Sequence, residues 1–247
     1  MTEVGPSRGR PYGGKCWLIN KNLRISNYNF INNDISYVEI SDSKSISKLI
    51  VIGLHLPFDD NSTEKLANYI SNLQILESII EEHVDIPLFI VGDFNTDLNL
   101  DKRYTKQLKK LMQECSIASV DYEFPNIDYT YQNGNYRNHI DHVLANEVAR
   151  NITIDCKIIE NMLNMSDHNP INTSFLLDIE STNLNIPVKN FYRFPWKDEE
   201  FLADFQKHFD DKIKIFDYNV PNETGKLVTC RAVFRKLSVA VTFDDSF

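Results

Sequence analysis

The pattern of apolar and polar positions along the chain predicts many short strands and few helices. Two runs, residues 48–57 and 87–95, are apolar at almost every position, which is typical of strands buried on both faces. Residues 35–40 alternate instead, which predicts a strand with one solvated face. Further short strands are expected at residues 16–19, 23–25, 117–120, 129–132, 139–144, 152–159 and 171–177.

Two amphipathic helices are expected between these strands. The first begins after a capping residue at Asn61, Ser62 or Thr63 and runs to Ile80, because apolar residues recur at helical spacing. The second covers residues 102–114 and carries lysines on its outer face. Strands outnumber helices and hairpin-like spacings dominate the second half. The pattern therefore favours an α+β fold, a two-layer β-sandwich flanked by helices, over a doubly wound parallel sheet.

The composition changes near Ile179, where Ser, Thr and Asn become frequent and Pro187 follows. Such a change is typical of a domain boundary. We therefore expect one domain over residues 1–180 and a linker-like tail over residues 181–247. The tail is expected to pack loosely, with one helix at residues 198–209.

The amino-acid composition limits the classes of protein to which the chain can belong. Hydrophobic residues make up 42% of the chain, with 15 Phe and 11 Tyr, which is enough for a large core. The net charge of -9 argues against tight non-specific DNA binding, but it is compatible with a nuclease whose metal site consists of carboxylates. The four cysteines form no CxxC pair, and no apolar run resembles a signal peptide or could span a bilayer. We expect a soluble intracellular protein with reduced thiols and no membrane partner.

Polar side chains follow apolar strands at several points of the chain. Asp93 and Asn95 end one buried strand, and because they are two residues apart they project to the same side. The other such positions are His55, Asp141 and the run Asp167-His168-Asn169. Each has a plain structural interpretation as a turn, a half-exposed strand residue or a hydrogen-bonded core histidine. Their repetition favours a site, because carboxylates, an amide and an imidazole suffice for phosphodiester hydrolysis with a bound metal.

Three motifs, in this order, resemble those of the endonuclease/exonuclease/phosphatase superfamily: Gly92-Asp93-Phe94-Asn95, Asn138-His139-Ile140-Asp141-His142-Val143-Leu144 and Ser166-Asp167-His168-Asn169-Pro170-Ile171. Together with the glycine-rich turn at residues 9–14, residues 9–178 look similar to the endonuclease domain of non-LTR retrotransposon polyproteins. The resemblance implies a deoxyribonuclease-like four-layer fold, a DNA substrate, Mg²⁺ or Mn²⁺ as the metal, no small-molecule cofactor and a nuclear location. The tail would lead towards a reverse transcriptase, and protein partners stay undetermined.

The resemblance also implies a role for each candidate residue. Asp93 would activate the attacking water and bind the metal, and Asn95 would orient Asp93 or the phosphate. Asp167 would bind the metal and pair with His168, which would leave His168 to stabilise the charge of the transition state. Asp141 would act as a supporting carboxylate.

At His55 and near the N-terminus the chain is harder to match to the family. His55 stands where apurinic endonucleases carry Tyr and secreted deoxyribonucleases carry His, so it would contact the phosphate or act as a general acid. The family's first strand precedes a glutamate that is its main magnesium ligand, and Glu3 lies too close to Gly13 to be that glutamate. We therefore expect an N-terminally truncated domain that lacks the first strand and has weak activity. The alternatives are a phosphoesterase for small molecules and a non-catalytic domain that binds nucleic acid or a partner.

Overall fold

The computed structural model describes residues 16–19, 23–41, 47–160 and 166–177, and the backbone of two later strands at residues 227–233 and 238–243. All of them belong to one compact unit, which combines Met1–Leu184 with Gly225–Phe247. The second unit, Asn185–Thr224, and with it the helix expected at 198–209, lies outside the described residues. Within the described ranges, no helix has both the length and the apolar composition that crossing a membrane requires.

A six-stranded sheet carries most of the candidate site residues. Its strands lie in the order β2 (Arg24–Phe30), β3 (Ile35–Ser41), β4 (Ser47–His55), β5 (Leu88–Asp93), β9 (Asp141–Asn146) and β6 (Ile117–Ser119). Strands β4 and β5 are parallel, which places His55 beside Asp93. Strands β5 and β9 are antiparallel, which places Asp93 opposite Asp141. Strand pairing alone therefore brings three candidate residues to one edge of the sheet.

A five-stranded sheet forms the second layer. Its strands lie in the order β1 (Cys16–Ile19), β13 (Ser238–Phe243), β12 (Leu227–Val233), β11 (Ile171–Leu176) and β10 (Thr153–Ile158). The tail was expected to pack loosely, yet β12 pairs with β11 and β13 pairs with β1, so these strands complete the sheet. The domain boundary at residue 180 stays a prediction, but residues 227–243 share the sheet of the first unit.

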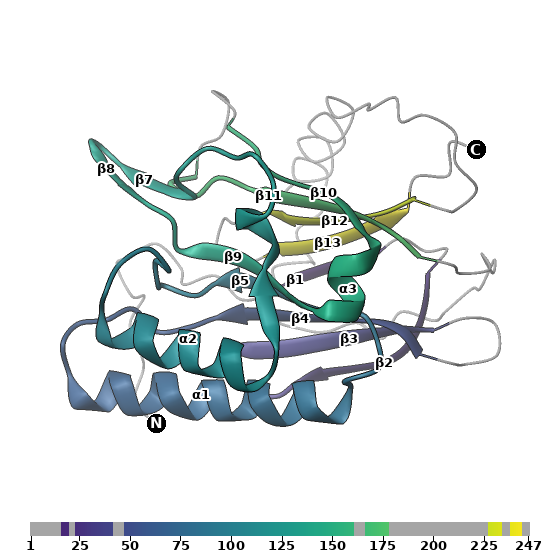
Figure 1. Cartoon of the computed structure of the whole chain (residues 1–247), viewed down its shortest axis with the longest axis horizontal. Helices are drawn as coiled ribbons and strands as arrows, with labels where there is room; N and C mark the ends of the chain where they lie inside the picture. The colour runs from purple at the N-terminus through teal and green to yellow at the C-terminus, as the bar shows by residue number, and fades with distance from the viewer. Residues whose placement is uncertain are drawn as a thin grey trace, which may run out of the picture. The chain divides into compact units, whose positions relative to one another are not determined.

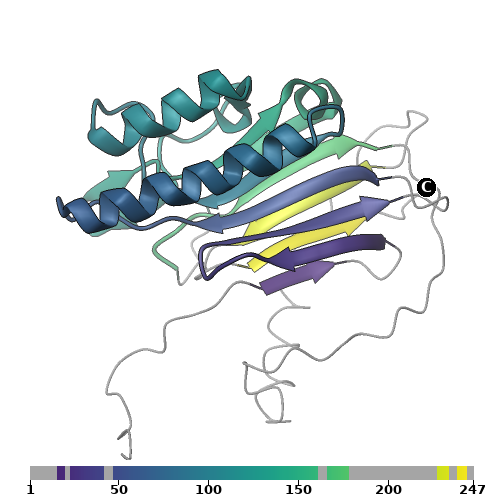
Figure 2. The same ribbon diagram turned by 90° about the horizontal axis from the view of Figure 1, so that it is seen from below.

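Two long helices lie side by side on one face of the six-stranded sheet, opposite to the face that carries the five-stranded sheet (Figures 1 and 2). Helix α1 spans Thr63–Glu82, and Ser62 caps it by accepting a hydrogen bond from the Lys65 amide. Helix α2 spans Arg103–Glu114 and buries four residues: Tyr104, Thr105, Leu108 and Leu111. Smaller elements follow: η1 (Val120–Tyr122), the β7–β8 hairpin (Tyr131–Asn133 and Tyr136–Asn138) and α3 (Glu147–Ile152).

The core has two parts because side chains alternate along β4. Leu49 and Val51 pack between the two sheets, whereas Ile50 and Ile52 pack against the helices. Burying each such side chain contributes about 1.5–3 kcal/mol. Across the sandwich the rings of Phe89 and Phe175 stack with their centroids 4.8 Å apart. The predicted α+β sandwich, with two strands buried on both faces, is confirmed. The described residues supply three of the four expected layers.

Two strands have other bounds than the sequence pattern predicted. β2 continues to Phe30, well beyond the predicted residue 25, because an edge strand with mostly exposed side chains shows no regular apolar spacing. The expected strand at 152–159 begins at Thr153, directly after the one-turn helix α3. Six residues are too few to show a helical period.

Candidate active site

The β5 strand ends at Gly92 and Asp93. Gly92 has φ +151°, and an added Cβ would lie 2.0 Å from the backbone oxygen of Leu54 on the neighbouring strand β4. Only glycine fits this close approach. Asp93 follows with 7% of its surface exposed, so its carboxylate is nearly buried where the strand stops.

Asn95 holds the Asp93 carboxylate in place. Its backbone N–H donates to Asp93 Oδ1 at 2.8 Å, and its side-chain Nδ2 donates to Asp93 Oδ2 at 3.2 Å. The same Nδ2 donates to the Leu56 carbonyl at 2.8 Å, which ties the turn to the end of β4. Asn95 has φ +48°, a left-handed conformation that asparagine tolerates better than most residues. The orienting role expected of Asn95 therefore has a geometric basis.

Asp141 is fully buried at the start of β9. The Thr130 hydroxyl accepts hydrogen bonds from the backbone N–H groups of Ile140 and Asp141, both at 3.0 Å. The Thr130 carbonyl also accepts a hydrogen bond from the Asn169 amide at 2.6 Å. Thr130 thus links the strand that carries Asp141 to the turn that carries His168.

His168 pairs with Asp141. Its Nδ1 lies 2.9 Å from Asp141 Oδ2 and 3.1 Å from Oδ1. The pairing of His168 with Asp167 that the resemblance implied is wrong, because the hydrogen-bonded carboxylate belongs to Asp141. Asp167 is exposed, and its backbone carbonyl accepts a hydrogen bond from the Gln132 amide at 2.7 Å. The Tyr131 ring lies edge-on to His168, with the ring centroids 4.9 Å apart.

The two acids and the histidine shift one another's pKa values. Burial raises the pKa of Asp93, and the nearby charge of Asp141 raises it further. Burial opposes charge on His168, but the hydrogen bond and charge of Asp141 outweigh this and raise the pKa of His168 to about 9. His168 is therefore an imidazolium at neutral pH, and Asp93 holds a proton more strongly than an ordinary aspartate does.

His55 lies at the open side of this group. Its Nε2 is 3.6 Å from Asp93 Oδ2, and 48% of its side-chain surface is exposed. The structure thus brings five of the six predicted residues together: His55, Asp93, Asn95, Asp141 and His168. The sixth, Asp167, is next to His168 in the sequence, but its exposed side chain lies outside the group.

The two carboxylates of this group fit a divalent cation, whereas the charged His168 bonds to Asp141 through Nδ1 and would lie beside the cation without binding it. One ligand atom each from Asp93, Asp141 and His168 lies within 4.8 Å of the others. The charge of Asp141 raises the pKa of Asp93, so the two buried carboxylates repel each other, and a cation between them would relieve that repulsion. Mg²⁺ prefers such carboxylate oxygens and usually keeps several waters. The proposed ligand role of Asp167 stays a prediction.

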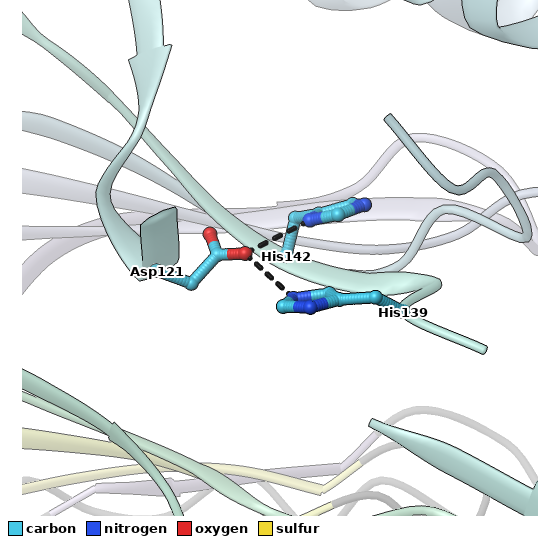
Figure 3. Close-up of side chains that lie close together, drawn as sticks. All are labelled: Asp121, His139 and His142. Carbon is cyan, nitrogen blue, oxygen red and sulfur yellow. Dashed lines mark hydrogen bonds and ion pairs between the residues drawn. The ribbon is translucent and has the colours of Figure 1, made fainter. Parts of the chain in front are cut away.

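A second polar cluster lies behind the site and was not anticipated. It consists of Asp121, His139 and His142, all buried (Figure 3). Burial alone would raise the pKa of Asp121 and lower that of His142, but their attraction outweighs it. The pKa of Asp121 is therefore lowered and that of His142 raised. The histidines belong to a motif already noted, whereas Asp121 follows an ordinary apolar segment and carries no local signal.

A comparison with family models adds an independent observation to this geometry. Residues 70–168 match the Endonuclease/Exonuclease/phosphatase family. The matched region contains Asp93, Asn95, Asp141 and His168, but not His55. It supports an endonuclease/exonuclease/phosphatase domain in this part of the chain. No curated protein matches the sequence.

Solved structures share the fold of this chain. The 3′ phosphatase NExo from Neisseria, bound to a product DNA hairpin, has a TM-score of 0.52 at 12% identity over 62% of this chain and 72% of that chain. The 3′-5′ exonuclease NExo from Neisseria meningitidis has the same TM-score and coverage at 13% identity. At this identity the likeness shows the fold, and the chemistry must be argued from the site.

Proposed function

We propose that this domain is a metal-dependent phosphodiester hydrolase that cuts DNA, as a retroelement-type endonuclease. The observation that carries the proposal is the meeting of Asp93, Asp141 and His168 within 4.8 Å. An acid with a raised pKa beside a charged histidine is an arrangement suited to proton transfer and phosphate binding.

Asp93 would accept the proton of the attacking water. A cation bound beside it would keep its carboxylate ionised, as a base must be, and the two hydrogen bonds from Asn95 fix the direction of that carboxylate. His55, which is 3.6 Å from Asp93 and half exposed, would contact the incoming phosphate or protonate the leaving group. These roles require the phosphate to lie above the end of β5.

His168 would stabilise the negative charge that develops on the phosphate. Its Nδ1 bonds to Asp141, which fixes the orientation of the ring and keeps it charged, and this positive charge would stabilise the phosphate oxygens. A divalent cation such as Mg²⁺ or Mn²⁺, held by Asp93 and Asp141, would polarise the phosphate and neutralise its charge. Asp167 is proposed as a further, outer ligand.

The proposal of DNA as substrate rests on the sequence motifs and on the neighbours. The three motifs at residues 92–95, 138–144 and 166–171 resemble retroelement endonuclease domains. One of the two NExo structures is a 3′ phosphatase bound to a product DNA hairpin and the other is a 3′-5′ exonuclease, which agrees with a DNA substrate. If the domain nicks chromosomal DNA, it would act in the nucleus. A small phosphoester as substrate is the alternative that the experiment must separate.

The experiment incubates the whole chain with supercoiled plasmid, with a 3′-phosphorylated oligonucleotide and with bis(p-nitrophenyl) phosphate, each with Mg²⁺, with Mn²⁺ or with EDTA. We expect slow nicking that needs the metal and is lost in Asp93→Ala and His168→Ala. Removing one such group typically costs about 10²–10³-fold in rate. An Asp167→Ala variant serves as the matched comparison. Hydrolysis of the small ester alone would favour the phosphoesterase, and no hydrolysis of any substrate would favour a binding domain.

A further inference from the structure

Asp121 is the centre of a saturated hydrogen-bond network. His139 Nε2 and His142 Nδ1 both donate to Asp121 Oδ2 at 2.9 Å, and Figure 3 shows the carboxylate facing the two rings. The Ser119 hydroxyl and the Val143 amide donate to Oδ1 at 2.8 and 2.9 Å. All four residues around Asp121 are therefore donors, which suits an ionised carboxylate in a buried place.

The contacts of this cluster are those of a hydrogen-bond network. The rings of His139 and His142 are nearly parallel, at 10°, with centroids 5.0 Å apart (Figure 3). His139 Nε2 and His142 Nδ1 face the same carboxylate oxygen, Asp121 Oδ2. A ring nitrogen that donates a hydrogen bond to a carboxylate has no lone pair left to bind a zinc ion.

His142 makes a second contact that His139 does not share. Its Nε2 lies 2.9 Å from the Thr96 carbonyl, while its Nδ1 faces Asp121. A carbonyl and a carboxylate both accept hydrogen bonds, so both ring nitrogens must carry a proton. His142 is therefore a buried cation, and Asp121 is its counter-ion.

Thr96 closes the turn that carries Asp93 and Asn95. Its hydroxyl donates to the Phe94 carbonyl at 2.9 Å and also bonds with the Tyr69 hydroxyl at 2.9 Å. The turn is thus held by Asn95 on the side of the active site and by His142 on the side of the core.

We propose that His142 is a positioning residue, which holds the turn carrying Asp93 and Asn95 through the Thr96 carbonyl and has Asp121 as its charge partner. The inference deepens the proposed function and rests on it for its catalytic meaning. The arrangement itself rests on the hydrogen bonds of His142 with Thr96 and Asp121. His142 follows Asp141 in β9. The same strand therefore carries Asp141, the partner of His168, and His142, which supports the turn of Asp93 on the neighbouring strand β5.

Two substitutions separate the two contacts of His142. The amide nitrogen of Asn lies near the position of a histidine Nδ1, so His142→Asn keeps a donor towards Asp121 and loses the donor towards Thr96. The amide nitrogen of Gln lies near the position of Nε2, so His142→Gln does the reverse. A residue that merely fills the core would respond alike to both changes. His139→Gln is the matched control, because His139 shares the carboxylate but has the Tyr122 ring, at 4.7 Å, as its neighbour.

The experiment is amide hydrogen exchange by NMR on the whole chain, read at the Asn95 amide that bonds to Asp93. We expect exchange to speed up about tenfold or more in His142→Asn, and to stay within about threefold of the wild type in His142→Gln and His139→Gln. Equal acceleration in both His142 variants would overturn the proposal. If His142→Asn does not fold, the ¹⁵N spectrum of wild-type His142 decides: a proton on Nε2, the nitrogen that faces the Thr96 carbonyl, supports the proposal, and its absence overturns it.

Metal content and activity complete the test. Zinc bound stoichiometrically by the wild type and lost in the His139 and His142 variants would overturn the hydrogen-bond assignment. If the wild type nicks DNA, His142→Asn should lower kcat with little change in KM. A wild type without hydrolysis would count against the proposed function alone, because the exchange measurement still decides the positioning role.

Discussion

His168 hydrogen-bonds to Asp141, 27 residues earlier in the chain, and not to the adjacent Asp167. The backbone bends at Ser166 and Asp167, and the Asp167 side chain is exposed whereas His168 is partly buried. An isolated antiparallel bridge joins His168 to Tyr131, the first residue of β7. The dyad of this domain is therefore Asp141–His168.

Substituting Asp141 should lower the pKa of His168 much more than substituting Asp167, whose charge contributes least to that pKa. In Asp141→Asn the charge that raises the pKa of His168 is gone while burial remains, so the pKa should fall by more than about one unit from its value of about 9. The measurement is an NMR titration of the His168 ring. Asp167→Asn is the control and should shift the midpoint by less than about half a unit. A larger effect of Asp167→Asn would restore the pairing implied by the resemblance.

Asp93→Asn should remove hydrolysis and yet stabilise the fold at mildly alkaline pH. The raised pKa of Asp93 means that the folded state binds its proton more tightly than the unfolded chain does. The contribution of Asp93 to the free energy of unfolding is complete below its pKa in the unfolded chain. It is lost as the pH rises through its pKa in the folded state. The neutral side-chain amide of the variant avoids this loss. Near pH 8 the free energy of unfolding of Asp93→Asn should therefore exceed that of the wild type by on the order of 1 kcal/mol. Urea unfolding at several pH values tests this; a variant that is less stable throughout would contradict it.

His168 should make the unfolding free energy depend on pH in the same direction. Its pKa is raised from 6.5 to about 9, so its contribution is complete below pH 6.5 and is lost as pH rises towards 9. The loss should be on the order of 2 kcal/mol, because one pKa unit corresponds to about 1.4 kcal/mol and the coupling with Asp93 reduces the effect. His168→Gln should flatten the curve. If the unfolding free energy of His168→Gln depends on pH as steeply as that of the wild type, the dependence comes from other groups.

Thr130→Val should loosen the site without changing the shape of the side chain. The Thr130 hydroxyl is the acceptor for two buried amides, those of Ile140 and Asp141, and valine offers no acceptor. Leaving buried donors unpaired costs about 1–3 kcal/mol each, so the unfolding free energy should fall by at least about 2 kcal/mol. Thr130→Ser keeps the hydroxyl and should lose less than about 1 kcal/mol. Denaturant titrations with unchanged slopes would show that stability itself has changed.

Gly92→Ala should prevent normal folding, whereas Gly134→Ala should be tolerated. The added carbon at residue 92 would meet the Leu54 backbone at 2.0 Å, and a backbone atom in a central sheet cannot move away. At Gly134 the same carbon meets nothing within 4 Å, so only the left-handed φ of +60° opposes it, at about 1 kcal/mol. Soluble yield and thermal unfolding of the two variants provide the comparison. Equal stability would mean that β4 and β5 are not paired in this register.

Local sequence patterns determined the strands that build the site and the residues that stand at their ends. The unbroken apolar runs around Val51 and Ile90 predicted two strands buried on both faces, and the polar residues that follow them predicted Asp93, Asn95 and His55 at one edge. These features depend on side-chain periodicity and turn chemistry, which act over a few residues.

Tertiary structure alone decided which distant residues meet. The partner of His168, the role of Thr130 and the link from Asp121 through His142 to Thr96 all depend on strand register, which no local pattern records. The same holds for β12 and β13, which complete a sheet although their composition was interpreted as a tail. An isolated strand cannot satisfy its backbone hydrogen bonds, so its place in the fold is settled only by the partner strands that the rest of the chain offers.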